Sequence, residues 1–423
     1  MKTLYDTIAE FISGDWGCEA ESDSATQSGY CIRAADIIPI ETHDYSTIPQ
    51  RFVSQSSFDQ RHLIKGDIVI EKSGGSPTQS TGRAVYISQS LLSAKRNIIC
   101  SNFCTAIRLK PEWNPYFVYQ YWRQVYNSGV FFNYEGKTSG LKNLQLEVAL
   151  KSIPIPEIDL PTQLRIAGVL GSIDEKIELN RKKIAELEAL AKTIYDYWFV
   201  QFDFPDANGK PYKSSGGKMV WNEQLKREVP EGWEVGPILN ISELKVGGTP
   251  SKKEVSYWNG NIPFWGPTDF KSGIFQFHTA ETITNMGFEH CSSDMLNEDA
   301  TIITARGSIG KVAMAGRSMA MNQSCFAFEA YNNCSPFVYH LARQLVAHLK
   351  NTSTGSVFNA FVASDLKNVF LLLGDSHVRR AYSELVQPMF DGIKAAVKTI
   401  DDLTGLRDLL LPLLMNGQVE MAG

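Results

Sequence analysis

The sequence predicts an α+β protein in which a β-rich domain occurs twice and each copy is followed by a long helix. Two observations carry this prediction: segments of the first half recur in the same order in the second half, and an apolar seam with helical spacing follows each copy. At 423 residues the chain is long enough for two or three domains with cores of their own. Its 43% hydrophobic, 11% aromatic and 21% charged residues are typical of a folded globular protein.

The internal repeat is visible in three segments. FVYQYWRQ at 117–124 recurs as FVYHLARQ at 337–344, with Phe, Val, Tyr, Arg and Gln in common. TSGLKNLQLEVALKSI at 138–153 aligns with TGSVFNAFVASDLKNV at 354–369, and KGDIVIEKSGG at 65–75 resembles EDATIITARGS at 298–308. Self-similarity in a fixed order indicates a duplicated structural unit. We therefore expect two related domains, at 1–155 and 233–375.

The apolar seam predicts two helices that pair with each other. Apolar positions step by three and four residues through about 162–199, which is the spacing of a coiled-coil face, and the seam recurs near the C-terminus with an interruption at Arg407. We expect these helices within 156–204 and 376–423, and a linker or hairpin at 205–232, which is rich in turn-forming residues. An ordinary core helix is the alternative, since many apolar stripes are only core. The candidate helix-pairing residues are Leu170, Ile173, Ile177, Ile184, Leu187, Ile194, Ile393, Ile400, Leu403 and Leu410.

Charge and cysteine usage limit the cellular compartment and the classes of partner that can be expected for this chain. The net charge is -5 and no segment is a basic block, so any DNA binding must rest on local clusters or on charge from a partner. The start MKTLYDTIAE is not a signal peptide, and no stretch has the apolar length of a membrane span, which predicts a cytoplasmic protein without a membrane partner. The seven cysteines include no C-x-x-C. We expect buried thiols and no metal, at Cys100 and Cys104 as elsewhere.

Motifs for catalysis are weak. The chain has no G-x-G triplet, and ARGSIGKV at 305–312 fails the phosphate-loop pattern at Ala305 and at Val312. A nuclease reading of Asp206 with Glu243 and Lys245 uses a spacing of carboxylate and lysine that recurs elsewhere in the chain. We therefore expect no catalytic residues and no cofactor in this chain.

Two polar loops are the best candidates for binding. In each half a β-rich run opens into a glycine loop with basic residues, EKSGGSPTQSTGR at 71–83 and TARGSIGK at 304–311. Arg, Lys, Gln and Asn read base edges, whereas hydroxyls and free amides fit phosphates, but Gly and Ser also dominate ordinary turns. Because the two loops differ, each would read a different half-site of an asymmetric target. The candidate DNA-binding residues are Lys72, Ser73, Gly74, Ser76, Thr78, Gln79, Arg83, Lys137, Arg306, Ser308, Lys311, Asn322 and Gln323.

Nearly the whole chain resembles the DNA specificity subunits of type I restriction-modification systems. The resemblance is carried by IPIPEIDLPTQLRIAGVLGSIDEKIELNRKKIAELEALAKTIYDYWFVQFDF at 153–204, VPEGWEV at 229–235, GSIGKVAM at 307–314, MNQSCFAF at 321–328 and LTGLRDLLLPLLMNGQV at 403–419. It implies two target-recognition domains in a pseudo-twofold arrangement, separated by two long helices that form an antiparallel coiled coil. It also implies a subunit without catalysis of its own.

The resemblance further implies the partners. Double-stranded DNA would be bound together with two adenine methyltransferase subunits, which would hold S-adenosylmethionine, and a restriction motor-nuclease subunit would use ATP and Mg. Two other readings of the residues stay open. One is a duplicated protein–protein scaffold without DNA specificity, and the other is a nuclease that acts by itself.

Overall fold

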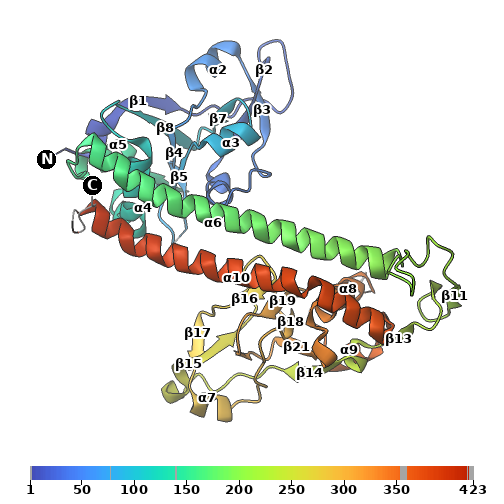
Figure 1. Ribbon diagram of the computed structural model, residues 1–423. Helices are drawn as coiled ribbons and strands as arrows, with labels where there is room; N and C mark the ends of the chain where they lie inside the picture. The colour runs from blue at the N-terminus through green and yellow to red at the C-terminus, as the bar shows by residue number, and fades with distance from the viewer. Residues whose placement is uncertain (1, 77, 139–140, 353–359, 417, 419–423) are drawn as a thin grey trace. The chain divides into compact units, whose positions relative to one another are not determined.

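The computed structural model describes residues 2–76, 78–138, 141–352, 360–416 and 418 (Figure 1). By its internal contacts the chain divides into two compact units, residues 1–179 with 400–423, and residues 180–399. Both units combine strands with helices, which confirms the predicted α+β class. In these ranges no helix has the length and apolar character needed to cross a membrane.

The first unit is built on an antiparallel sheet in the order β1-β8-β4-β6. A second sheet has the order β3-β2-β7, with β2 parallel to β7, and a small third sheet has the order β5-β10-β9. Strand β4 is buried along its whole length, as its central place in the sheet requires. The bounds are β1 (Ile8–Ser13), β2 (Gln27–Ile32), β3 (Gln50–Val53), β4 (Ile68–Glu71), β5 (Ser73–Gly74), β6 (Ala84–Tyr86), β7 (Ile98–Cys100), β8 (Cys104–Leu109), β9 (Glu135–Thr138), β10 (Leu141–Leu144), α1 (Ile37–Glu41), α2 (Gln55–Arg61), α3 (Gln89–Ala94), α4 (Pro115–Asn127) and α5 (Leu146–Ser152).

The second unit has a sheet in the order β14-β21-β18-β19-β16 and another in the order β17-β15-β20. Strand β15 is parallel to β20, and the pairs β11-β12 and β13-β22 are antiparallel. The bounds are β11 (Met219–Asn222), β12 (Arg227–Pro230), β13 (Glu234–Gly236), β14 (Ser242–Val246), β15 (Trp258–Trp265), β16 (Phe275–Gln276), β17 (Glu281–Ile283), β18 (Thr301–Thr304), β19 (Val312–Ala315), β20 (Ala320–Met321), β21 (Cys325–Ala330), β22 (Leu371–Gly374), α7 (Asn285–Glu289), α8 (Ser335–Thr352) and α9 (Ala363–Asn368).

The two units share one topology, which confirms the duplication. The order β1-β8-β4-β6 of the first unit matches β14-β21-β18-β19 of the second, and each unit has one parallel pair in its smaller sheet. A close contact between a glycine and a backbone carbonyl also recurs directly after the strand at the edge of each of these sheets, β1 and β14. A Cβ on Gly14 would stand 1.9 Å from the carbonyl oxygen of Ser101, and a Cβ on Gly247 would stand 1.9 Å from that of Asn322.

Two long helices, α6 (Leu160–Tyr195) and α10 (Ser376–Met415), contribute residues to both units. In the second unit Tyr382 Oη donates to the carbonyl oxygen of Ala191 at 3.2 Å, and a Cβ on Gly392 would stand 3.1 Å from Leu187 Cδ1. Later residues of α10 thus meet earlier residues of α6, so the predicted antiparallel pairing is confirmed there.

The same antiparallel contact occurs within the first unit. Arg407 Nη1 lies 3.0 Å from Asp174 Oδ1, so the interruption of the apolar seam at Arg407 is an ion pair between the two helices. Beyond it, α10 adds Leu411, Leu414 and Met415 to the core that contains Ile166, Ala167 and Leu170 of α6.

The helix ends follow from their local sequences. Helix α6 begins two residues before the expected 162, where Asp159 Oδ1 accepts from the backbone N–H of Thr162 at 3.1 Å. It ends at Tyr195, followed by a π-helical turn at Asp196–Val200. Helix α10 continues through Pro388 in the interior of the helix.

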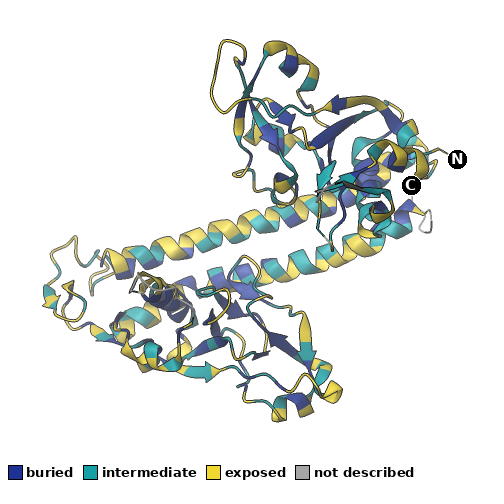
Figure 2. Cartoon of the chain, turned by 180° about the vertical axis from the view of Figure 1, so that it is seen from behind, coloured by how far each residue is buried: buried dark blue, intermediate teal, exposed yellow. Residues whose placement is uncertain are grey.

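Burial along the helices varies by position (Figure 2). Of the candidate pairing residues, the buried ones are Leu170, Ile173, Ile177 and Ile393, and the half-buried ones are Ile184, Leu187, Ile194, Ile400, Leu403 and Leu410. Cys100 and Cys104 are buried free thiols, and burial raises the pKa of Cys104 to about 11.

Candidate nucleic-acid interface

The ends of the first candidate loop, residues 71–83, are fixed by internal hydrogen bonds. Glu71 is fully buried and accepts from Arg83 Nε at 2.8 Å and from Arg83 Nη2 at 2.6 Å. This bond to the carboxylate raises the pKa of Arg83. Glu135 Oε1 accepts from the backbone N–H of Thr81 at 2.7 Å, and Trp122 Nε1 donates to the Gly82 carbonyl at 2.8 Å. Arg83 therefore closes the base of the loop.

The tip of this loop is a tight turn. The backbone N–H of Ser76 donates to the Gln79 carbonyl at 2.9 Å, the reverse bond is 3.2 Å, and Gly75 has a φ of 75°. Thr78 is exposed, whereas Ser76 and Gln79 are half-buried. The turn therefore presents short polar groups at the surface.

The first half of the same loop runs along an exposed aromatic side chain. Lys72 N–H donates to the carbonyl of Phe103 at 2.8 Å, and the Phe103 side chain is 58% exposed. Ser73 Oγ donates to Asn143 Oδ1, and Gly74 continues strand β5, which pairs with β10. Lys137 lies in the adjacent strand β9, and its side chain is outside the described part of the structure.

The second candidate loop, residues 304–311, is held by one buried threonine. Thr304 Oγ1 donates to the Ser308 carbonyl at 2.6 Å and accepts from the Lys311 N–H at 3.0 Å. Arg306 and Ser308 project into solvent from this closed loop, and Gly307 between them has a φ of 74°. Among the described residues the Arg306 side chain has no hydrogen-bond or ion-pair partner, so its donors are available to a ligand.

The turn at Asn322 and Gln323 lies next to this loop. The backbone N–H of Ala305 donates to the Ser324 carbonyl at 2.8 Å, which joins the two segments. Asn322 Oδ1 accepts from the Ser324 N–H at 3.0 Å and so shapes the turn, whereas Gln323 is exposed and accepts from Thr249 Oγ1. The candidate residues of the second unit thus form one surface made from two loops.

The structure groups the sequence candidates by unit and places beside them one exposed residue, Phe103, that sequence reasoning missed. Lys72 to Arg83 share one loop in the first unit, and Arg306 to Lys311 meet Gln323 in the second. The turn that carries Phe103 was missed, although SNFC at 101–104 corresponds to NQSC at 322–325, which contains the candidates Asn322 and Gln323. Extending the repeat alignment to these turns is the signal that would have found the turn, although Phe103 itself aligns with Ser324.

Comparison with known protein families finds a match in each half of the chain. The family model of the type I restriction modification DNA specificity domain matches residues 49–189 and 230–372, one match in each half. The MjaIX type I restriction enzyme specificity subunit of Methanocaldococcus jannaschii is 26% identical over 283 residues, which is 64% of this chain and 62% of that protein. The HindI specificity subunit of Haemophilus influenzae is 22% identical over 327 residues, 64% of this chain and 70% of that protein.

A solved structure has the same fold. The S subunit of a type I restriction-modification system from M. genitalium superposes with a TM-score of 0.59 at 16% identity. The superposition covers 100% of this chain and 96% of that one, so the likeness of fold extends over both repeats.

Proposed function

Because the chain belongs to the family of type I restriction-modification DNA specificity domains, whose members are non-catalytic components, we propose that it reads a bipartite, asymmetric DNA target and positions two adenine methyltransferase subunits on it. In this proposal the loop at 71–83 reads one half-site and the loop at 304–311 with Gln323 reads the other. The bound target is double-stranded DNA in the cytoplasm.

The observation that carries the proposal is one topology bearing two different loops. The sheets and the glycine contacts at Gly14 and Gly247 recur, which supports an equivalent placement of DNA on each unit. The loop sequences and lengths do not recur. The first loop has thirteen residues and an ion pair between the buried Glu71 and Arg83, whereas the second loop has eight residues and an exposed Arg306. A shared scaffold with divergent reading loops favours two unlike half-sites over a palindrome.

The partners supply the chemistry. The methyltransferase subunits hold S-adenosylmethionine, and a restriction motor-nuclease subunit that joins them uses ATP and Mg. Helices α6 and α10 run through both units, and their length sets the spacing of the two half-sites in this proposal.

The proposal is tested by mapping methylated adenines. DNA would be sequenced from cells that express the chain with its candidate methyltransferase, and from cells that lack only the chain. A split asymmetric motif that disappears without the chain supports the proposal. Methylation that does not depend on the chain contradicts the proposal and favours the hypothesis of a protein–protein scaffold.

The loop assignment is tested by Arg306→Ala in the same assay. Removal of a bidentate arginine contact relaxes specificity at one base pair by about 1–3 kcal/mol, so one position in one half of the motif should become degenerate while the other half stays intact. Lys226→Gln, a change at an exposed lysine in the hairpin β11–β12, is the matched control. An unchanged motif in Arg306→Ala would rule out this arginine as a base reader.

A further inference from the structure

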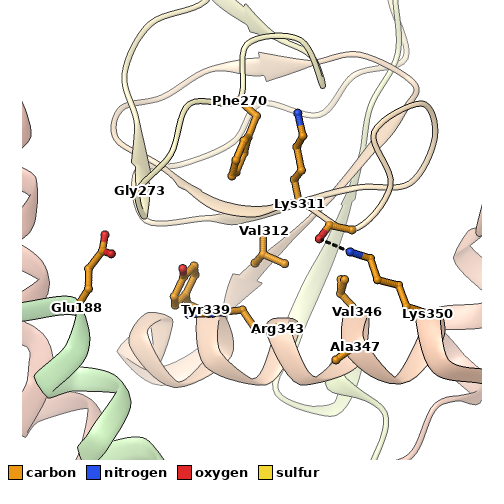
Figure 3. Close-up of a pocket in the computed structure, with 11 residues that line it drawn as sticks. Glu188, Phe270, Gly273, Lys311, Val312, Tyr339, Arg343, Val346, Ala347 and Lys350 are labelled. Carbon is orange, nitrogen blue, oxygen red and sulfur yellow. Dashed lines mark hydrogen bonds between the residues drawn. The ribbon is translucent and has the colours of Figure 1, made fainter. Parts of the chain in front are cut away.

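A pocket of about 500 Å³ opens in the second unit beside the candidate reading loop (Figure 3). Its walls are formed by helix α8, by the segment at Gly310–Val312 and by the turn at Phe270–Gly273. Lys311, Arg343 and Lys350 line it, and Glu188 is the only carboxylate among its described lining residues. The pocket therefore has more positive than negative charge, in a chain whose net charge is -5.

The cations that line the pocket come from two elements. Arg343 and Lys350 lie seven residues apart on α8, about two turns, so they share a face of the helix, and both are exposed. Figure 3 shows them along the helix below the loop that carries Lys311, with Glu188 on α6 at the end away from Lys350. All three basic residues line the pocket, but the Lys311 side chain points away from α8, beside Phe270.

The basic groups are oriented without being neutralised. Lys350 Nζ donates to the Gly310 carbonyl at 3.3 Å, and Lys311 Nζ donates to the Pro267 carbonyl at 3.3 Å and lies 5.0 Å from the centre of the Phe270 ring. Within the described ranges none of the three has a carboxylate within 4.0 Å. Carbonyls and an aromatic face hold a cation in place and leave its charge for a ligand.

The first unit has an arginine at the same position, but there it lies beside a carboxylate. Arg123 of FVYQYWRQ occupies the position of Arg343 in FVYHLARQ, and Arg123 Nε lies 3.7 Å from Glu41 Oε1. Arg343 has no such partner among the described residues. The cationic excess is therefore a property of the second unit.

Gly310 makes the arrangement possible. Its φ is 79°, and a Cβ there would stand 2.1 Å from Lys350 Cε and 2.8 Å from Val346 Cγ1. Glycine thus allows the turn and lets the lysine pass across it.

We propose that this pocket binds the DNA phosphodiester backbone next to the half-site read by the loop at 304–311. Lysine and arginine side chains neutralise phosphates, and contacts to phosphate fix the register of a protein on DNA. Lys311 belongs both to the loop and to the pocket, so base reading and phosphate binding adjoin. The inference rests on the proposed function and assigns Arg343 and Lys350, which carry no sequence signal for DNA binding, to the same interface.

Salt dependence of binding tests the proposal. Arg343→Gln and Lys350→Gln would be compared with the unchanged chain, each in complex with its methyltransferase, on cognate and non-cognate duplexes. The slope of log K against log salt should become shallower by about 0.9 for each phosphate that the variant no longer neutralises, and both duplexes should be weakened equally. Lys226→Gln is again the control, and it should leave the slope unchanged.

Glu188→Gln tests whether a more positive pocket binds DNA more tightly. The backbone N–H of Ile274 donates to Glu188 Oε1 at 3.2 Å, and glutamine retains an oxygen that can accept this bond. Removal of the one negative charge should strengthen DNA binding, opposite to the effect of the cation variants. Weaker binding by Glu188→Gln, with an unchanged thermal unfolding midpoint, would count against a phosphate in the pocket.

Two further comparisons distinguish a failure of this inference from a failure of the proposed function. Specific binding with the same salt slope in Arg343→Gln and Lys350→Gln overturns this inference alone, whereas absence of specific binding by the unchanged complex overturns the proposed function and the inference with it. Calorimetry with ATP or inorganic phosphate in the absence of DNA covers a free phosphate as the occupant. Tight ATP binding that Arg343→Gln abolishes, with no change in the DNA salt slope, would assign the pocket to a free nucleotide and overturn the DNA proposal.

Discussion

His340 is a residue at which the two copies of the fold differ, because glutamine occupies the equivalent position, Gln120. The His340 ring is 4% exposed and stacks on Tyr195 with 4.8 Å between ring centres. Burial lowers its pKa to about 3, and the charges of Arg343 and Lys192 act in the same direction. The histidine is therefore neutral in the folded protein over the range in which it titrates when unfolded.

This burial predicts a pH-dependent loss of stability. Since the folded pKa lies below the unfolded value of 6.5, the unfolded state binds more protons, and stability falls as the pH falls below 6.5. Between pH ~7.5 and ~5.5 the loss from this one group is about 1.4 kcal/mol. Urea unfolding of the unchanged chain and of His340→Gln at both pH values measures it. Equal pH dependence in the two proteins would contradict a buried neutral His340.

Arg83 and Arg306 are both candidate base readers, but they differ in what their removal does to the fold. Arg83→Ala leaves the fully buried Glu71 without its partner, which costs about 3–5 kcal/mol. Arg306→Ala removes an exposed side chain and should change stability by less than about 0.5 kcal/mol. Thermal and denaturant unfolding of both variants would separate these effects before any DNA assay. A stable Arg83→Ala protein would show that the Glu71 contact contributes little.

At the scale of elements, the recurring glycine contacts predict matched sensitivity in the two units. A Cβ at Gly14 or at Gly247 would stand 1.9 Å from a backbone carbonyl oxygen, so Gly14→Ala and Gly247→Ala should each destabilise their unit by about 1–3 kcal/mol. Gly168→Ala is the control, because nothing lies within 4 Å of a Cβ there and alanine favours the helix by about 0.5–1 kcal/mol. Unfolding midpoints of the three variants test this ranking. Tolerance of alanine at Gly14 alone would show that the contact is not equivalent in the two copies.

Elements were predictable from the sequence where their signal is local or repeated. The spacing of apolar residues located α6 and α10, and the recurrence of FVYQYWRQ as FVYHLARQ indicated the duplication, because periodicity and repetition are properties of contiguous residues. The repeated segments lie in α4 and α8, which were not predicted as helices from the sequence. Partners distant in the chain were not visible. The ion pair of Arg407 with Asp174 spans more than two hundred residues, so in sequence Arg407 appeared only as a break in the seam.

The candidate site was predictable only in part for the same reason. The glycine loops stand out by composition, but the bond from Arg83 to Glu71 depends on the return of the chain through β6. Arg343 and Lys350 belong to a helix whose sequence indicated only the repeat, and their role as pocket residues depends on the packing of α8 beside Gly310. A binding surface made by several elements is a tertiary property, which composition and spacing do not encode.

At the scale of the whole molecule, the net charge of -5 means that DNA repels the chain at long range. Its affinity for DNA must therefore come from local cations and from its partners. We therefore predict that the chain alone binds a non-cognate duplex weakly and with a shallow salt slope, and that the methyltransferase complex binds it more tightly and with a steeper slope, because the partner neutralises further phosphates. Fluorescence anisotropy across a range of salt concentrations, with the methyltransferase alone measured in parallel, tests this. If the isolated chain bound the non-cognate duplex as tightly as the complex, the local cations would outweigh the net charge, and the partner would not be needed to hold the DNA.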